Sequence, residues 1–430
     1  MSGPALELGR KRWFGSGSGA GKLLRDRNFA PFLVGNLLSG TGTWFQNLAQ
    51  AILVYRLTHS AFLLGVVGFA QFAAVMILVP WAGSAADRFD RRRILIGSQL
   101  VATFVTATLT VLSALGLVTA GIVIGLVLAL GVTSAFAAPA GLALLPSLVE
   151  ERHLRTAIAL NSVAYNIARV VGPVLAALVI AHLGVTWAFG INSCSYLGAI
   201  AGILAVSPRT RQSRPRERPR LRESLTLIRN DRRLLALLYV VAAVSIASDP
   251  AVTLGPAFVT RLFELRDSLA GYLVGAFGLG AVIAAFALAP RLRGSRNGFA
   301  TTMAVTAGGA VCFALAPDFP VALIGMFFVG FGFLASNTTA TTRLQLGVTE
   351  AQRGRVMAIW SIAFFGVRPV ASLIDGAIAS TAGLRIASFT MSLPVLVGAA
   401  AIVVAGSRSK RSAARAATPT LEPEDVSHAS

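Results

Sequence analysis

Long apolar runs alternate with short polar segments along most of the chain. A run of about 20 apolar residues is long enough to cross the hydrocarbon core of a bilayer as a helix, so each run predicts one membrane span. The twelve predicted spans are 29–55, 60–82, 94–115, 118–142, 157–181, 184–206, 234–260, 268–290, 298–316, 319–342, 356–380 and 386–406. The pattern therefore predicts an all-α integral membrane protein.

The basic residues gather in alternate polar segments. Of the 38 lysines and arginines, 32 lie in residues 1–28, 83–93, 143–156, 207–233, 291–297, 343–355 and 407–430. Cytoplasmic loops retain Lys and Arg, so this alternation predicts that both termini face the cytoplasm and that the number of crossings is even. The net charge of +20 is then explained by membrane topology and needs no nucleic acid as partner. With 55% hydrophobic and only 13% charged residues, the chain does not have the composition of a soluble protein.

The two halves of the chain resemble each other. Residues 157–184 align without a gap with residues 356–383, and Arg169 matches Arg368 while Gly184 matches Gly383. We therefore expect two parallel six-helix repeats, an arrangement typical of transporters that bind substrate between the repeats. The predicted organisation is a cytoplasmic tail (1–28), an N-terminal half (29–206), a basic cytoplasmic linker (207–233), a C-terminal half (234–406) and a second tail (407–430).

Part of the linker has helical periodicity. Residues Leu221 to Ile228 predict a short helix on the inner membrane surface, whereas residues 207–220 are equally well interpreted as a solvated charged linker. The glycines between Gly15 and Gly21 do not have the spacing of a phosphate-binding loop. We expect no ATPase domain, no cofactor and no metal site.

A motif follows the second apolar run, where Val79 to Ala82 is predicted to end the helix. It consists of Gly83, Asp87, Arg88, Arg91 and Arg92 at fixed spacing. The pattern resembles the loop between the second and third helices of major facilitator superfamily transporters, which latches their inner gate. The resemblance implies that Asp87 caps the eleventh helix in the outward-open state, braced by Arg88 and Arg92. The alternative is a charge cluster that only marks the cytoplasmic side.

Further motifs narrow this resemblance to the branch that contains the enterobactin exporter and the transmembrane secretion effectors. They are Gly42-Thr-Trp44-Phe-Gln46, Asp87-Arg-Phe-Asp-Arg-Arg-Arg93, Leu145-Pro-Ser-Leu-Val149, Ala159-Leu-Asn161-Ser162, Ala168-Arg-Val-Val-Gly172-Pro173 and Arg353-Gly-Arg-Val-Met357. Gly172-Pro173 also resembles the antiporter motif of exporters. The branch implies efflux of drugs or siderophores, usually coupled to protons.

Four ionisable residues lie clearly inside predicted spans, where such residues usually serve function or pair with one another. Asp249, followed by Pro250, predicts a broken helix and is the leading candidate to carry a coupling proton. Asp375 lies two turns beyond Arg368 on the same helical face, so the two either pair structurally or act in transport. Arg169 contacts either backbone carbonyls or an anionic substrate.

Polar residues at helical spacing mark one face of the first span. They are Asn36, Ser39, Thr43, Gln46, Asn47 and Gln50. Such a face avoids lipid, so it lines a watery cavity or joins neighbouring helices. Trp44 beside it is a candidate surface for stacking against an aromatic substrate, and Asn337 in the tenth span is a weaker cavity candidate.

Together these features predict a secondary exporter of a small amphipathic or anionic molecule, working as a monomer in the cytoplasmic membrane of a bacterium. The alternatives are an importer of a small nutrient on the same fold and a non-transporting receptor or scaffold.

Overall fold

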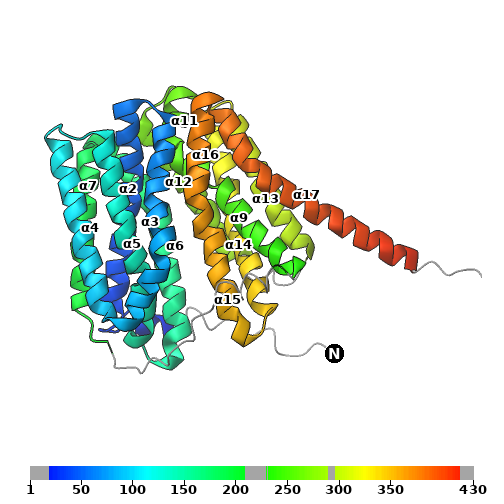
Figure 1. Ribbon diagram of the computed structural model, residues 1–430, viewed down its shortest axis with the longest axis horizontal. Helices are drawn as coiled ribbons and strands as arrows, with labels where there is room; N and C mark the ends of the chain where they lie inside the picture. Colours follow the sequence, from blue (N-terminus) through cyan, green and yellow to red (C-terminus); the bar gives the residue numbers. More distant parts are fainter. Residues whose placement is uncertain (1–18, 209–228, 230, 289–295, 417–430) are drawn as a thin grey trace, which may run out of the picture.

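The computed structural model describes residues 19–208, 229, 231–288 and 296–416, and every regular element in them is a helix. The predicted Leu221–Ile228 helix and most of both tails lie outside these residues. After the short α1 (Gly19–Leu23), the N-terminal half occupies the left of Figure 1. Its helices are α2 (Ala30–Thr58), α3 (Ala61–Arg88), α4 (Arg91–Ala114), α5 (Ala120–Leu148), α6 (Leu154–His182) and α7 (Val185–Leu204), with a 3-10 turn, η1 (Glu151–His153), before α6.

The C-terminal half occupies the right of Figure 1. Its helices are α9 (Arg232–Ala247), α10 (Asp249–Thr253), α11 (Gly255–Arg261), α12 (Ala270–Leu288), α13 (Arg296–Leu315), α14 (Phe319–Leu346), α15 (Glu350–Ser361), α16 (Val367–Thr381) and α17 (Leu384–Ala416). A 3-10 turn, η2 (Asp267–Leu269), precedes α12, and a π-helix, η3 (Ile362–Gly366), joins α15 to α16. The last helix continues beyond residue 406, where the sequence predicted the span to end.

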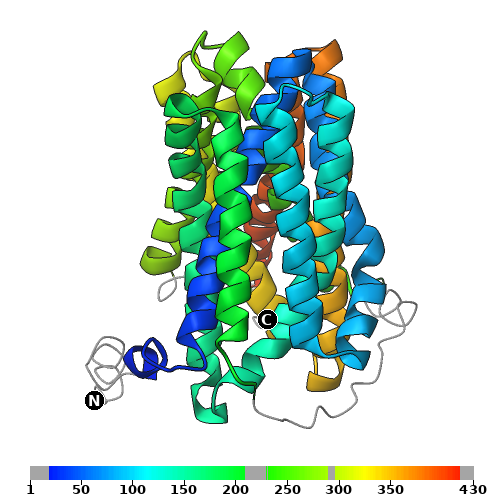
Figure 2. The ribbon, with the colours of Figure 1, turned by 90° about the vertical axis from the view of Figure 1, so that its left-hand side faces the viewer.

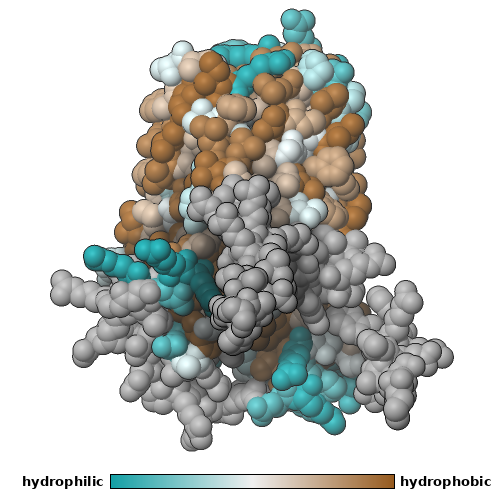
Figure 3. Space-filling model, turned by 90° about the vertical axis from the view of Figure 1, so that its right-hand side faces the viewer, coloured by the Kyte–Doolittle hydropathy of each residue, from teal (hydrophilic) through white to brown (hydrophobic). Residues whose placement is uncertain are grey.

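Among the described residues, eleven helical stretches are long and apolar enough to cross a membrane. The predicted first span corresponds to α2, which is 29 residues long but is not one of the eleven because its polar face lowers its hydropathy. It packs against α6 and α7. The helices run side by side between the two ends of the molecule (Figure 2), and hydrophobic side chains cover the body between hydrophilic ends (Figure 3).

The two ends differ in charge, and we name them accordingly. The basic end carries the connections near residues 89–90, 149–153 and 347–349, and it lies at the bottom of Figure 1. The opposite end carries the connections 59–60 and 262–269.

The gate motif is mostly helical, which corrects the prediction that the helix ends at Ala82. Helix α3 continues through Pro80 to Arg88. A proline removes one backbone hydrogen bond, but helices in apolar surroundings tolerate it, and the alanines that follow favour continued helix. The connection is therefore short, and Asp90 begins the next helix by accepting hydrogen bonds from the backbone N–H groups of Arg92 (2.8 Å) and Arg93 (3.2 Å).

The predicted break in the seventh span is confirmed. Helix α9 ends at Ala247, and two short helices that begin around Pro250 and Pro256 complete the span. A second irregularity was not predicted, namely the π-helix η3 immediately before Arg368. Pro369 cannot donate a backbone hydrogen bond to the residue four positions earlier, so the regular ladder is interrupted there. π-Helical segments are frequent at functional sites.

Two turns that match in the repeat alignment have the same backbone conformation. Gly184 and Gly383, which match in the alignment, both adopt left-handed backbone conformations, with φ of 93° and 98°. Each precedes the first residue of the last helix of its half. A residue with a side chain is strained at such φ values, so both positions require glycine for the same reason.

The two halves meet along two seams of small residues. At the α3–α16 seam, a Cβ atom on Gly65 would lie 2.9 Å from the Cα of Gly376. At the α6–α12 seam, a Cβ atom on Gly278 would lie 2.9 Å from the Cα of Val170, and Gly271 lies against the carbonyl of Pro173. The second helix of each half thus packs against the fifth helix of the other. Both seams occupy the part of the helices nearer the opposite end.

We predict that the close crossing of α12 and α14 depends on glycine. A Cβ atom at Gly280 would collide with the backbone carbonyl of Phe327, whereas one at Gly308 on α13 would meet nothing within 4 Å. Overpacking of this kind costs about 1–3 kcal/mol. Gly280→Ala should therefore lower the melting temperature of the purified protein in detergent, while Gly308→Ala should not. Equal melting temperatures for the two variants would show that these helices are not packed so closely.

Candidate functional site

Arg169 of α6 lies in a cage of aromatic rings contributed by both halves. Its side chain is buried, and its Cζ atom lies 5.8 Å from the ring centre of Trp44, 4.4 Å from that of Phe277 and 5.1 Å from that of Phe333. Its Nε atom has no hydrogen-bond partner among the described residues. Aromatic faces attract a cation by about 0.5–2 kcal/mol, but they do not neutralise its charge.

Arg368 is arranged in the same way in the other half. Its Cζ atom lies 5.5 Å from the ring centre of Phe72 on α3 and 5.2 Å from that of Phe364 in the π-helix. Its Nε atom is also buried without a partner in the described part of the chain. The two guanidinium groups are close enough to repel each other. Neither of these two repeat-related cations has a carboxylate at ion-pair distance in the part of the chain that the structure describes.

Tyr165 is a residue of this site that the sequence did not reveal. It lies one turn before Arg169 on α6, toward the basic end, and is electrostatically close to both arginines. Its side chain is 57% exposed although it lies within a span. The sequence alone does not distinguish Tyr165 from an ordinary aromatic residue that faces lipid.

The two acidic residues inside the spans lie near each other in the C-terminal half. Asp249 accepts hydrogen bonds at one oxygen, Oδ2, from the hydroxyls of Thr253 (3.0 Å) and Ser372 (2.9 Å). Asp375 is 0% exposed, and neither of its oxygens has a hydrogen-bond partner among the described residues. The expected pairing of Arg368 with Asp375 is therefore not formed. Arg368 instead interacts electrostatically with Asp249.

The polar face of α2 mainly joins helices. Gln50 donates to Gln71 of α3 (2.8 Å), which in turn donates to Asn47 (2.9 Å). Asn192 of α7 donates to Gln46 (3.2 Å). The remaining contacts are Asn36 with Asn161 (3.1 Å) and Thr43 with Tyr196 (3.5 Å). Inter-helix bonding thus accounts for most of these side chains. Within the described residues, however, Gln46 Nε2 and, on α14, Asn337 Oδ1 are buried without a hydrogen-bond partner.

The antiporter-like motif positions the aromatic cage. A Cβ atom on Gly172 would lie 2.6 Å from the Cβ of Trp44 and 3.1 Å from the carbonyl oxygen of Thr41, so glycine allows α6 to approach α2 closely. This approach brings the Trp44 ring over Arg169. Pro173 follows at the α6–α12 seam. Trp44 thus lies over the guanidinium of Arg169 itself.

The arginines of the gate motif hold this segment to the N-terminal half. Arg91 donates to the carbonyl of Ala143 on α5 (3.1 Å), and Arg92 donates to the carbonyls of Ile203 (3.2 Å) and Leu204 (2.8 Å) at the end of α7. Cations at the last carbonyls of a helix also interact favourably with its dipole. Gly83 has open space around its Cα, Arg88 is exposed, and the side chain of Asp87 lies outside the described atoms.

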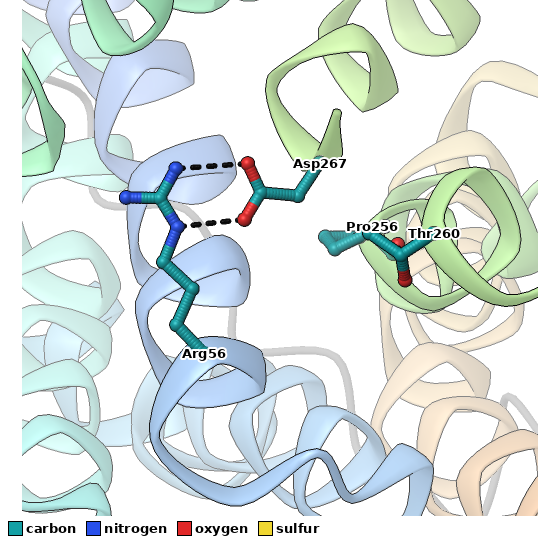
Figure 4. Close-up of polar contacts among 4 residues, drawn as sticks. All are labelled: Arg56, Pro256, Thr260 and Asp267. Carbon is teal, nitrogen blue, oxygen red and sulfur yellow. Dashed lines mark hydrogen bonds and ion pairs between the residues drawn. The ribbon is translucent and has the colours of Figure 1, made fainter. Parts of the chain in front are cut away.

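At the opposite end, an ion pair joins the halves (Figure 4). Arg56 at the end of α2 donates from Nε (2.6 Å) and from a terminal nitrogen (2.8 Å) to the two oxygens of Asp267 in η2. The hydrogen bond to Asp267 raises the pKa of Arg56. Arg261 donates to the carbonyl of His59. His59 and Glu264, both in these connections, have positive φ angles of 51° and 55°.

Comparison with known proteins identifies the class. The family model of the transmembrane secretion effectors matches residues 20–429, so the chain belongs to this family of major facilitator superfamily transporters. The enterobactin exporter EntS of Shigella boydii serotype 4 is 26% identical over 333 residues, which cover 73% of this chain and 76% of that protein. The corresponding exporter of Escherichia coli O81 is 25% identical over the same length.

Solved transporter structures share the fold. A bacterial homologue of the lysosomal transporter Spinster, solved in an inward-facing and unoccupied conformation, matches with a TM-score of 0.70 at 13% identity, covering 91% of this chain and 98% of that one. A bacterial homologue of the iron transporter ferroportin, also inward-facing, matches with a TM-score of 0.65 at 15% identity, covering 89% and 98%. The chain is thus a multi-pass membrane transporter and not an enzyme.

We predict that the Arg56–Asp267 pair stabilises contact between the halves at the opposite end. An exposed ion pair contributes about 0.2–1 kcal/mol, which corresponds to roughly a one-and-a-half- to five-fold shift between two states. Asp267→Asn should increase the population open at the opposite end, measured by spin-label distances between the halves. The reversed pair Arg56→Asp with Asp267→Arg should restore the original distances. Unchanged distances in Asp267→Asn, or a reversed pair that does not restore them, would show that the ion pair has no role in closure.

Proposed function

We propose that this protein exports a small anionic, aromatic or amphipathic organic molecule across the bacterial cytoplasmic membrane by alternating access. The distribution of basic residues supports a cytoplasmic basic end and cytoplasmic termini. In that orientation the seams and the Arg56–Asp267 pair close the outer side, so the described conformation faces inward. Export as the direction is supported by the exporter relatives.

The observation that carries the substrate class is the pair of arginines, Arg169 buried and Arg368 partly buried, whose Nε atoms are buried without a hydrogen-bond partner among the described residues. Removing a charge from water without a partner costs several kcal/mol, and two cations near each other add repulsion. An anionic group between Arg169 and Arg368 would offset both costs and accept the hydrogen bonds that their Nε–H groups leave free. The surrounding rings of Trp44, Phe277 and Phe333 favour a ligand with an aromatic or apolar part.

The site joins substrate binding to the motion of the halves. Arg169 belongs to the N-terminal half and Arg368 to the C-terminal half, and each lies on the fifth helix that forms a seam with the other half. A ligand bound by both arginines therefore contacts the two bodies that rock against each other. Such a ligand binds best when the spacing of the arginines fits it, which gives substrate binding a preference between conformations.

A proton is the proposed coupling ion, and Asp249 and Asp375 are its candidate carriers. The carboxyl group of Asp249 lies in the broken seventh span, interacts with Arg368 and accepts hydrogen bonds from two hydroxyl groups. Broken helices commonly carry coupling sites in secondary transporters.

We predict that Arg169 binds an anionic group through its planar fork. Arg169→Lys keeps the charge but loses that geometry, and a charge-assisted hydrogen bond contributes about 1.5–3 kcal/mol. In proteoliposomes, the variant should weaken the apparent affinity for fluorescein, an anionic aromatic probe, by roughly 10- to 100-fold, and affect neutral Nile red little.

Arg152→Lys is the matched control, because Arg152 is exposed and pairs with Glu150 far from the site. It should leave both probes unaffected. Unaltered fluorescein affinity in Arg169→Ala would remove the support for an anionic substrate.

We also predict that Asp87 takes part in the inner gate. A carboxylate at a helix amino end contributes about 0.3–1 kcal/mol, so Asp87→Asn should reduce the transport rate by roughly two- to five-fold without changing membrane insertion. Asp231→Asn makes the same charge change at the basic end, and asparagine caps a helix as well as aspartate, so it should transport normally. Normal transport by the Asp87 variant would show that the motif only marks the cytoplasmic side of the membrane and has no role in the gate.

A further inference from the structure

We propose that Asp249 and Asp375 together form one proton-binding site, that the proton resides on Asp375 in this conformation, and that the α3–α16 seam controls access to the site from the opposite end. The role of this site in transport rests on the proposed function. Its protonation and its access to water do not, and they can be measured without a substrate.

The burial of both carboxyl groups, and the absence of hydrogen-bond donors to Asp375 among the described residues, require a proton at this pair. Asp375 is 0% exposed and Asp249 is 5% exposed. The charged group that acts on Asp375 is the carboxyl group of Asp249, and the charged groups near Asp249 are Arg368 and Asp375. Two neighbouring carboxylates that both lose their protons in an apolar interior face repulsion and a desolvation cost of several kcal/mol each. The pair therefore holds one proton.

The surroundings of the two carboxyl groups decide which one holds it. Asp249 accepts two hydroxyl hydrogen bonds and has the guanidinium of Arg368 nearby, and both features stabilise a negative charge. Asp375 has neither a donor nor a cation among the described residues. These environments favour different protonation states for the two carboxyl groups. Asp249 is therefore the deprotonated anion, and Asp375 is the protonated, neutral acid.

Helix α3 of the N-terminal half covers the two hydroxyl groups that donate hydrogen bonds to Asp249. A Cβ atom on Gly68 would lie 2.8 Å from the Oγ of Ser372 and 3.3 Å from the Oγ1 of Thr253, the two hydroxyls that donate to Asp249. One turn nearer the opposite end, Gly65 packs against the backbone of Ser372 and Gly376. The glycines thus bring the α3 backbone directly onto the hydroxyls.

This arrangement links proton access to the motion of the halves. A movement that opens the opposite end must part α3 from α16, and the hydroxyls and Asp249 then meet water. When the seam closes, they are sealed on that side again. At the repeat-related α6–α12 seam, the contacts instead involve apolar residues and backbone, with Gly275 against Val174 and Gly278 against Val170. The two seams therefore have different roles, and only the α3–α16 seam adjoins the carboxyl pair.

Infrared spectroscopy of the full-length protein in lipid nanodiscs tests the protonation. The wild type at neutral pH should show the C=O stretch of a protonated, buried carboxylic acid, and Asp375→Asn should lose it. Asp318→Asn is the matched control, because Asp318 caps α14 at the opposite end, where asparagine also serves. This variant should keep the band. A wild type without the band, or a band that persists in Asp375→Asn, would overturn the proposal.

Exchange in D2O tests the access. The carboxylic-acid band should shift slowly in the wild type and faster in Asp267→Asn, which loosens the opposite end. Equal exchange rates would overturn the assignment of the seam as the access route.

Transport in inverted vesicles tests the role in coupling. With fluorescein as probe, Asp375→Asn should lose accumulation driven by a pH gradient but keep exchange down the gradient of fluorescein itself. Wild-type accumulation in this variant, or accumulation that a sodium gradient drives in place of protons, would overturn the role. If the wild type moves no fluorescein while the infrared band behaves as expected, the substrate proposal fails and the proton site stands.

Discussion

The interaction on which the rest of the structure depends is the close approach of two helix backbones at each seam between the halves. Glycines on α3 and α12 allow α16 and α6 to come within van der Waals contact of backbone atoms. In an apolar medium there is little hydrophobic driving force between helices, so association relies on such packing. The seams fix how the halves meet, and thereby where the charged side chains on α6 and α16 lie.

The charged side chains of the spans separate by sign. Arg169 and Arg368 lie with aromatic rings from both halves, whereas Asp249 and Asp375 lie within the C-terminal half beside the α3–α16 seam. Arg368 is electrostatically close to both groups and connects them. Under the proposed function, an anion at the arginines and a proton at the carboxyl groups would therefore act on one common residue. This gives a physical path through which the binding of one could influence the other.

Much of the helical architecture follows from the pattern of apolar residues, because the length of a span is set by the thickness of the bilayer. The break at Asp249 follows from Pro250, and the matching turns at Gly184 and Gly383 follow from the internal repeat. The end of α3 was placed too early, because Pro80 stops a helix in water more effectively than in an apolar environment. The π-helix before Arg368 was missed because Pro369 signals an interrupted hydrogen-bond ladder but does not specify a π-helix.

The sequence by itself determined the membrane class, the spans and the residues that carry charge inside them, since these depend on local composition and periodicity. Only the tertiary structure decided which of those residues meet. Asp375 and Arg368 share a helical face, yet Asp375 lies toward Asp249 and Arg368 lies among rings from two helices. Tyr165 likewise belongs to the site only because it lies electrostatically close to arginines of both α6 and α16. Such pairings depend on how distant helices pack, and helical periodicity contains no information on the neighbour that each face will meet.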